Sequence, residues 1–358
     1  MGFSGARLSD SGFTIPADLR DDRPIERKIS FNIMQSDTPK GVPFKRHFDI
    51  INRELYEVLK SRVPLIEDMG KHTLLGDGKR LRPLMFVLSC NLCNYHREDI
   101  YRLSTIFEYI HTASLLHDDV LDNAEIRRKR PSANQVWGNH AAVLEGDFLY
   151  SKALSIGVRV NNMPFLTRLT ETTLRMTEGQ ILEFVHTNDW NLNKEQYMEI
   201  ITAKTAILIS AACACGAIIS VAETKKEESL AQFGLNAGIA FQLIDDLLDY
   251  TSSERVFGKP VGKDLREGKM TLPLIYTLSQ IEASEKKRVK ALLTNPGTTD
   301  DDYQDIIDLV RRNGALDRVQ QEAQGFVDHA ADCLKIFPDS ETKRELIRLS
   351  QHIIDREH

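Results

Sequence analysis

Apolar residues recur every three or four positions along most of this chain of 358 residues. The pattern begins with a stripe of five residues, Phe44, Phe48, Ile51, Leu55 and Leu59. It continues to the end of the chain, where Leu346, Leu349 and Ile353 keep the same spacing. This spacing fits the 3.6-residue turn of an amphipathic α-helix, and no convincing series of strands with hairpin turns interrupts it. The sequence therefore predicts one all-α domain, a helical bundle over residues 43–358.

Residues 1–42 are polar, contain Gly, Ser and Pro, and show no sustained period, so we expect a flexible extension. They lack the apolar core of a secretory signal and carry too many acids for a transit peptide. The five cysteines lie mostly in apolar surroundings, which indicates reduced thiols and a cytoplasmic protein. The net charge of −6 argues against a nucleic-acid partner.

The run most like a membrane span is AILISAACACGAIISVA, at residues 206–222. It is short for a bilayer and rich in small residues, so we expect a packed core helix and no transmembrane segment. Peripheral contact with a membrane stays open.

Three carboxylates lie close together in LLHDDVLD, namely those of Asp118, Asp119 and Asp122. If residues 106–122 are helical, Asp118 and Asp122 lie one turn apart on one face. Carboxylates this close repel one another unless a cation lies between them, and their oxygen ligands suit Mg²⁺. A basic cluster that includes Arg127 and Arg128 follows at once and could hold a phosphate.

The same pattern recurs at Asp245, Asp246 and Asp249 in FQLIDDLLDY, again followed by lysines. A single acidic triad would be explained equally well by a solvated helix end. Two triads with basic partners instead predict two facing helices that hold one polyanion through several Mg²⁺ ions, with Mn²⁺ a possible substitute.

These blocks, with GKRLRP at residues 78–83, resemble the trans-isoprenyl (polyprenyl) diphosphate synthases, most of all the long-chain octaprenyl and solanesyl types. The similarity runs from about Phe44 to the C-terminus, with the blocks in the order of the family. It implies helices around a central cavity, with isopentenyl diphosphate and an allylic diphosphate as substrates. It also implies a homodimer.

The resemblance assigns roles residue by residue. The six aspartates and Lys204 would be catalytic. Isopentenyl diphosphate would bind Lys79, Arg82, His111 and Arg128. The allylic diphosphate would contact Arg127, Lys204, Thr205 and Gln242, with Lys259 and Lys269 completing the pocket. Further basic residues at Lys263 and Arg266 leave open which lysine touches phosphate, and without the family His111 would be taken as a polar residue on a packed helix.

The reaction that the resemblance implies begins with ionisation of an allylic C–O bond. Metal ions and basic side chains would neutralise the departing diphosphate. The double bond of isopentenyl diphosphate then attacks the allylic cation, and the departing diphosphate takes the proton that is lost. The tail needs an apolar channel that excludes water.

Product length depends, in this family, on the residues just before the first acidic triad. Ala113 and Ser114 are small there, which favours a long-chain product. Tyr109 and Ile110 lie one turn deeper, and Tyr109 as a cap would give a farnesyl or geranylgeranyl product instead. Close helix packing is the competing explanation for Ala113.

Three other functions are less consistent with these motifs. A terpene cyclase replaces the second acidic triad with an Asn/Ser/Glu arrangement. Non-catalytic subunits of prenyl synthases typically lose one triad, and both are intact here. A metal-binding helical protein without catalysis would not need the basic residues beside each triad.

Overall fold

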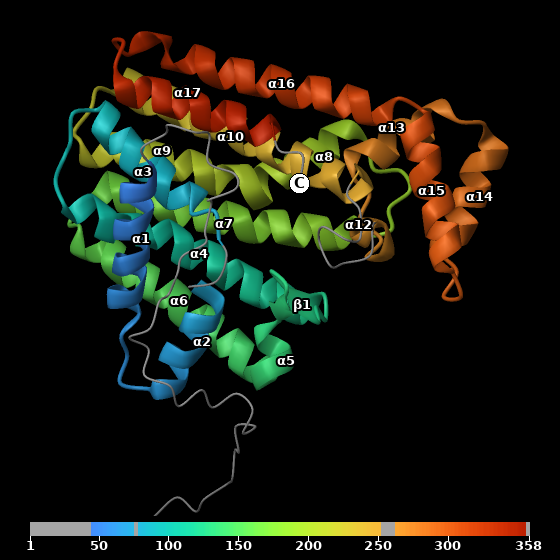
Figure 1. The fold of residues 1–358 in the computed structure, drawn as a ribbon, viewed down its shortest axis with the longest axis horizontal. Coiled ribbons are helices and arrows are strands. Elements are labelled where there is room, and N and C mark those ends of the chain that lie inside the picture. Colours follow the sequence, from blue (N-terminus) through green and yellow to red (C-terminus); the bar gives the residue numbers. More distant parts are fainter. Residues whose placement is uncertain (1–43, 75–77, 252–261, 356–358) are drawn as a thin grey trace, which may run out of the picture. The chain divides into compact units, whose positions relative to one another are not determined.

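The computed structural model describes residues 44–74, 78–251 and 262–355, and within these ranges it is almost entirely helical (Figure 1). The expected extension at residues 1–42 lies outside the described residues. The first helices are α1 (Phe44–Leu59), α2 (Pro64–Leu74), α3 (Leu81–Leu92) and α4 (Asp99–Leu121). All five residues of the first apolar stripe are buried on α1, as their spacing predicts. That face packs against α4, α2 and α3.

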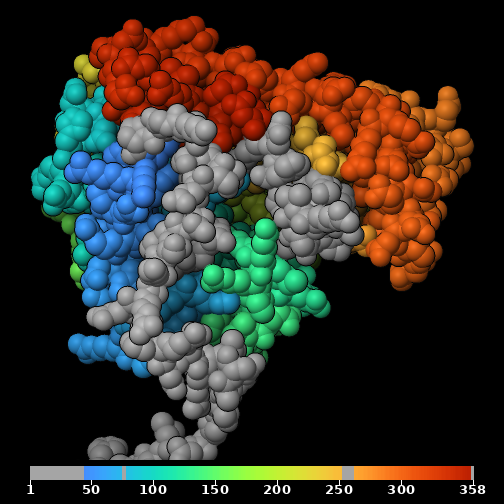
Figure 2. All heavy atoms as spheres, viewed as in Figure 1, coloured from blue at the N-terminus to red at the C-terminus, as the bar shows by residue number. Residues whose placement is uncertain are grey.

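A two-stranded hairpin follows α4 and was not expected from the sequence. Its strands are β1 (Ile126–Arg127) and β2 (Arg130–Pro131), with Arg127 opposite Arg130. The turn between them is Arg128-Lys129, and both residues have positive φ, 52° and 62°. Two-residue hairpin turns usually carry Asn or Gly at such positions, so residues 126–131 contain no hairpin signal. Figure 2 shows this segment in green at the surface.

The next helices are α5 (Ala133–Trp137), α6 (Asn139–Arg159) and α7 (Met163–Val185). Helix α6 lies along α4, and α7 packs against the central helix of the bundle, α9. The start of α7 is fixed by Asn162, whose side chain accepts a hydrogen bond from the backbone N–H of Phe165.

One continuous helical stretch then forms the centre of the bundle. It consists of α8 (Lys194–Ile201), a single π-helical turn η2 (Thr202–Ala206) and α9 (Ile207–Ile219). By length and composition Lys194–Ile219 would be long and apolar enough to span a membrane, but most of its apolar window is buried inside the protein. Helices α3, α4, α7 and α10 (Thr224–Thr251) surround α9. It is therefore a core helix, as the sequence predicts.

The C-terminal part completes the bundle. Its helices are α12 (Lys263–Arg266), α13 (Leu272–Gln280), α14 (Ala283–Leu293), α15 (Asp300–Arg312), α16 (Ala315–Cys333), η3 (Leu334–Ile336) and α17 (Glu341–Ile354). Helix α16 packs along α10 and α17 (Figure 1). Leu346, Leu349 and Ile353 are buried on α17, which confirms the late apolar stripe.

Glu145 on α6 is an exception to the apolar core. Its residue surface is 2% exposed, and neither carboxyl oxygen has a hydrogen-bond partner among the described residues. Burial raises the pKa of Glu145 to about 8, from an ordinary value of 4.5. The carboxyl group is therefore mostly protonated at neutral pH, and its burial costs stability.

We expect Glu145→Met to raise the free energy of unfolding at pH 7 by about 1–3 kcal/mol, because it removes a buried polar group without a partner. Between about pH 4.5 and pH 8 the folded protein holds this proton and the unfolded chain has released it. The free energy of unfolding of the natural protein should therefore fall as pH rises through this range. The variant should not show this part of the fall. Urea unfolding at several pH values measures both effects.

The matched control is Glu199→Met, at an exposed position on α8. It should change stability by less than about 0.5 kcal/mol. Equal effects of the two substitutions would contradict a cost specific to Glu145.

Candidate active site

The first acidic triad lies at the C-terminal end of α4, and its carboxylates face basic side chains rather than bulk solvent. Asp118 is 8% exposed and Asp119 is 3% exposed. The ammonium group of Lys204 lies 3.7 Å from Asp118 and also pairs with Glu183 of α7. At the end of the helix, Lys269 lies 3.4 Å from Asp122. The sequence did not assign a role to Glu183, whose partner is 21 residues away.

Lys269 links the first acidic triad to the segment that follows α12. It lies just after α12 and pairs both with Asp122 of the first triad and with Glu267, at 2.7 Å. Burial alone would lower the pKa of Lys269, but the carboxylates of Glu183, Glu267 and Asp122 raise it well above its ordinary value. Helix α7, the end of α4 and the segment after α12 therefore bring acidic groups to one lysine.

The second acidic triad lies at the C-terminal end of α10, and two of its members are held by the protein. Asp246 is 4% exposed and accepts hydrogen bonds from the Tyr197 hydroxyl, at 2.6 Å, and from the Gln242 amide, at 2.7 Å. Burial raises the pKa of Asp246 to about 7, although these two hydrogen bonds act in the opposite direction. The carboxylate oxygens of Asp249 accept the backbone N–H groups of Lys263 and Asp264, at 3.0 and 2.9 Å.

Asp245 connects this triad to the start of α3. Burial lowers the pKa of Arg82 to about 10, and the carboxylates of Glu108 and Asp245 oppose that shift. Arg82 therefore lies within electrostatic reach of Asp245. The two triads are more than 100 residues apart in the sequence. The turn η2 connects their surroundings, because Lys204 pairs with Asp118 and Thr205 donates to Gln242, a partner of Asp246.

Guanidinium groups surround His111 on α4. Burial lowers the pKa of His111 well below its ordinary value, and Arg82, Arg128, Arg127 and Arg80 lower it further. Arg82 is buried, and its Nε has no hydrogen-bond acceptor among the described residues. A Cβ added to Gly78 would lie 2.9 Å from a guanidinium nitrogen of Arg128, so this glycine lets the loop approach the arginine closely. This arrangement is a cradle for a polyanion, because buried charge requires compensation.

Arg80 fixes the position of this cradle. Its guanidinium donates to Glu108 at 2.8 Å and to the Asn52 side chain at 2.9 Å. A third hydrogen bond goes to the Leu74 carbonyl oxygen. The ion pair with Glu108 is almost fully buried, so the loss of one partner would leave an uncompensated charge. Sequence analysis assigned no role to Arg80, and its partners are 28 residues away in each direction.

Lys204 and Thr205 lie on the π-helical turn η2. Helices α7 and α10 each approach this turn closely at a glycine. A Cβ on Gly179 of α7 would lie 2.6 Å from the backbone nitrogen of Lys204. A Cβ on Gly238 of α10 would lie 2.7 Å from Cα of Ala206. Single π-helical turns are frequent at functional sites. Here the turn aims Lys204 at the first triad, while Thr205 donates to Gln242 at 2.9 Å.

The other predicted residues are distributed as follows. Arg127 pairs with Asp119, at 2.9 Å from Nε. Lys79 is exposed at the entrance to α3. The predicted residue Lys259 lies outside the described residues. The structure thus brings Arg82, His111 and Arg128 together, and places Lys204 and Lys269 at the first triad.

The four residues considered for product length have different surroundings. Ala113 and Ile110 are buried on α4, and Ser114 is half-buried with its hydroxyl donating to the His111 carbonyl oxygen at 2.8 Å. Tyr109 is fully buried, and its hydroxyl donates to the Leu55 carbonyl oxygen of α1 at 2.8 Å.

The donor set fits divalent cations that share their coordination with a ligand. No group of three His, Cys, Asp or Glu residues within the described ranges is arranged to hold a metal ion alone. Mg²⁺ is usually bound through one or two carboxylates together with substrate phosphates. Asp118 and Asp122 fit this arrangement, because each has a lysine ammonium group where a cation is required.

Comparison with known proteins agrees with this geometry. The model of the polyprenyl synthetase family matches residues 63–310. An octaprenyl diphosphate synthase of Haemophilus influenzae is 34% identical over 308 residues, covering 86% of this chain and 93% of that protein. Heptaprenyl diphosphate synthase component 2 of Bacillus subtilis is also 34% identical, covering 85% and 86%.

A solved structure of similar fold is the polyprenyl synthase from Caulobacter crescentus CB15, complexed with calcium and isoprenyl diphosphate. It has a TM-score of 0.84 and 35% sequence identity, and the alignment covers 88% of this chain and 96% of that one. The expected family and its all-α fold are thereby confirmed. With both acidic triads and the arginine cradle around one site, this chain belongs to the polyprenyl synthetase family of prenyltransferases.

Proposed function

We propose that this enzyme condenses isopentenyl diphosphate with an allylic diphosphate, and repeats the step to make a long trans-polyprenyl diphosphate. The observation that carries the proposal is Arg82, which is buried near His111 with no hydrogen-bond acceptor for its Nε among the described residues, while Arg128 and Arg127 also act on His111. A diphosphate would bind here, because it supplies the acceptor that Arg82 lacks and negative charge beside the other arginines.

In this proposal the two substrates occupy different parts of the site. Isopentenyl diphosphate lies against Arg82, His111 and Arg128. The allylic diphosphate lies between the triads, where Lys204 and Lys269 exchange their carboxylate partners for phosphate oxygens. Thr205 and Gln242 already form a hydrogen-bonded pair beside Asp246, which positions them to contact the same ligand.

Mg²⁺, or Mn²⁺ in its place, would be held by Asp118 and Asp122 on one side and by Asp245 on the other. The bound ions would supply charge neutralisation for the departing diphosphate. Lys204, Lys269 and Arg127 add positive charge at the leaving oxygen, and the enzyme needs no side-chain nucleophile. The diphosphate that leaves then accepts the proton released when the new double bond forms.

Asp118→Ala and Asp245→Ala should each lower kcat by at least about a hundredfold, because each removes a carboxylate that shares a cation with the leaving group. Far-UV circular dichroism should stay unchanged. The assay combines isopentenyl diphosphate, farnesyl diphosphate and Mg²⁺, and measures products by chromatography. Asp49→Ala, at an exposed position on α1, is the matched control. Near-normal turnover in either triad variant would disprove the two-triad mechanism.

We further propose that α4 lines the channel for the growing tail. Ala113 and Ser114 are small, and Tyr109 is held toward α1 by its hydrogen bond to Leu55. The positions four and five residues before Asp118 therefore carry only small side chains. A long product of the octaprenyl class therefore fits better than a farnesyl product.

Ala113→Phe should shorten the product by at least one isoprene unit, because one helical turn of about 5.4 Å is comparable to one unit. Reversed-phase chromatography of the dephosphorylated products measures the length. Ser114→Ala keeps the position small and should leave the length unchanged. A normal product from Ala113→Phe would show that this face of α4 does not line the channel.

The chain is also proposed to form a homodimer through one face of α6 and α7. Large apolar residues that are exposed in the single chain cluster there: Val143, Leu144, Val158, Leu174, Ile181, Phe184 and Val185. On α7, Leu174, Ile181 and Val185 are seven and four residues apart, so they share one face. An exposed apolar stripe on two helices favours a second copy of the chain, since a two-fold axis can pair the surface with itself.

Phe184→Asp should convert the dimer to a monomer, because it places a charge on the most exposed aromatic residue of this face, which is 78% exposed. Sedimentation equilibrium measures the mass. Ile336→Asp on η3, another exposed apolar position, is the control and should stay dimeric. A monomeric natural protein, or a mass that requires a second kind of chain, would contradict the homodimer.

A further inference from the structure

We infer that His72 is a positioning residue, which tethers strand β2 and thereby holds Arg128 in the diphosphate cradle. The inference rests on the proposed function, because it concerns the affinity for isopentenyl diphosphate. His72 lies on α2, outside the acidic triads and the arginine cluster.

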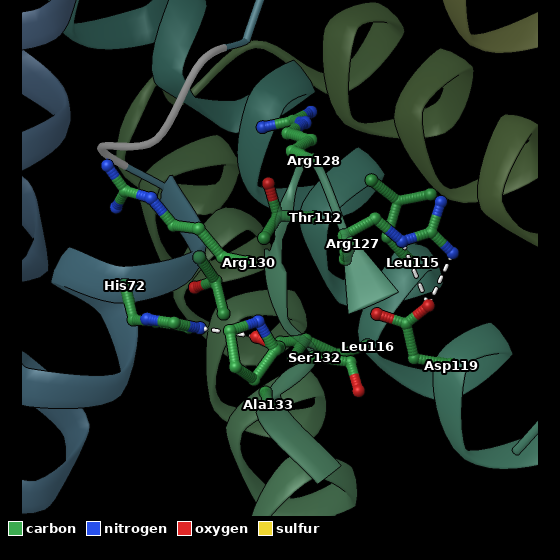
Figure 3. A pocket seen from close by; sticks show the side chains of 12 residues that line it. His72, Thr112, Leu115, Leu116, Asp119, Arg127, Arg128, Arg130, Ser132 and Ala133 are labelled. Carbon is green, nitrogen blue, oxygen red and sulfur yellow. Dashed lines mark hydrogen bonds and ion pairs between the residues drawn. The ribbon is translucent and has the colours of Figure 1, made fainter. Parts of the chain in front are cut away.

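Two contacts tether the hairpin, one on each strand, and Figure 3 shows both as dashed lines. On β1, Arg127 pairs with Asp119 of α4. On β2, the carbonyl oxygen of Pro131 lies 2.9 Å from Nε2 of His72. A carbonyl oxygen can only accept, so Nε2 must carry the hydrogen that is donated.

The hairpin has little other support beneath it. Its strands have two residues each, and isolated hairpins are only marginally stable. A cavity of about 40 Å³ lies between the hairpin, α2 and α4, enough for roughly three water molecules. It is lined by His72, Thr112, Leu116 and both flanks of the hairpin (Figure 3). The base of the hairpin is closed by buried Ser132, whose hydroxyl donates to the carbonyl oxygens of Ala124 and Glu125. The strand β2 itself is incompletely packed, and His72 supplies the contact that holds it toward α2.

The turn that bears Arg128 has backbone angles that are unfavourable for its own residues. Arg128 and Lys129 both have left-handed backbones, which are unfavourable for side chains other than glycine. Such a turn persists only where the surrounding structure determines it. The register of β1 and β2, closed on one side by Asp119 and on the other by His72, provides that constraint.

His72 is itself well placed to act as an anchor. Its ring packs edge-on against Trp137 of α5, with centroids 5.1 Å apart and planes at 79°. The imidazole therefore joins three elements, α2, β2 and α5. A substitution that keeps a donor should preserve the tether, whereas an apolar residue of similar size should preserve only the packing.

The expected consequence is selective for one substrate. Arg128 follows β1 directly but reaches the cradle beside Gly78, so its position depends on both strands. Arg127 keeps its own tether to Asp119 when β2 is released. Loss of the His72 hydrogen bond should therefore weaken binding of isopentenyl diphosphate and leave the allylic diphosphate site nearly unaffected.

The experiment compares His72→Leu with His72→Gln in the full-length enzyme, each substrate being varied while the other is saturating. His72→Leu should raise KM for isopentenyl diphosphate about five- to tenfold, while kcat and KM for the allylic substrate change less than twofold. His72→Gln should recover most of the affinity, because its amide can donate to Pro131. His96→Leu, at an exposed position after α3, should match the natural enzyme.

Three results would overturn the inference. These are an unchanged KM in His72→Leu, an equal rise in both KM values, or a His72→Gln variant as weak as His72→Leu. Thermal unfolding of His72→Leu within a few degrees of the natural protein shows that the kinetic change is not a loss of folding. Failure of the proposed function itself is distinct, because the natural enzyme would then form no product from the two substrates.

Discussion

The site depends on a balance of buried charge that the protein alone leaves incomplete. Four arginines act on His111, and Nε of Arg82 is the buried nitrogen among them without a hydrogen-bond acceptor in the described part of the chain. The acidic side is better matched, since Lys204 and Lys269 pair with Asp118 and Asp122. Lysines therefore keep these carboxylates ordered, while Nε of Arg82 has no acceptor among the described residues. A bound diphosphate would pair with the arginines, and its cations would pair with the carboxylates. The same groups would therefore serve both substrate affinity and catalysis.

Rigid elements hold these groups before any ligand binds. The buried pair of Arg80 and Glu108 joins the entrance of α3 to α4. The π-helical turn that bears Lys204 is confined by Gly179 and Gly238, where added Cβ atoms would meet backbone. Asp249 accepts two backbone N–H groups at the start of α12, so the end of α10 and the lysine-bearing segment are linked. Such preorganisation reduces the cost of ordering side chains during the reaction.

The sequence predicted the helices and the acidic triads because both follow from local periodicity. The stripe on α1 and the core helix α9 could be read from spacing and composition alone. Contacts between residues far apart in the sequence could not be predicted in this way. Nothing near Tyr197 predicts its hydrogen bond to Asp246, which is 49 residues away. The hairpin was missed because its turn uses Arg128 and Lys129 where glycine or asparagine would have signalled it.

The two proposed substrate sites are supported by different elements of the fold. The groups proposed to bind isopentenyl diphosphate come from α3, α4 and the hairpin, and they are supported by α1 and α2 through Asn52 and His72. The groups proposed to bind the allylic diphosphate come from η2, α10 and the segment after α12, and they are supported by α7 and α8 through Glu183 and Tyr197. Helix α4 contributes to both sets. Because the supporting elements differ, substitutions behind one set can change affinity for one substrate without altering the other, whereas changes on α4 should affect both.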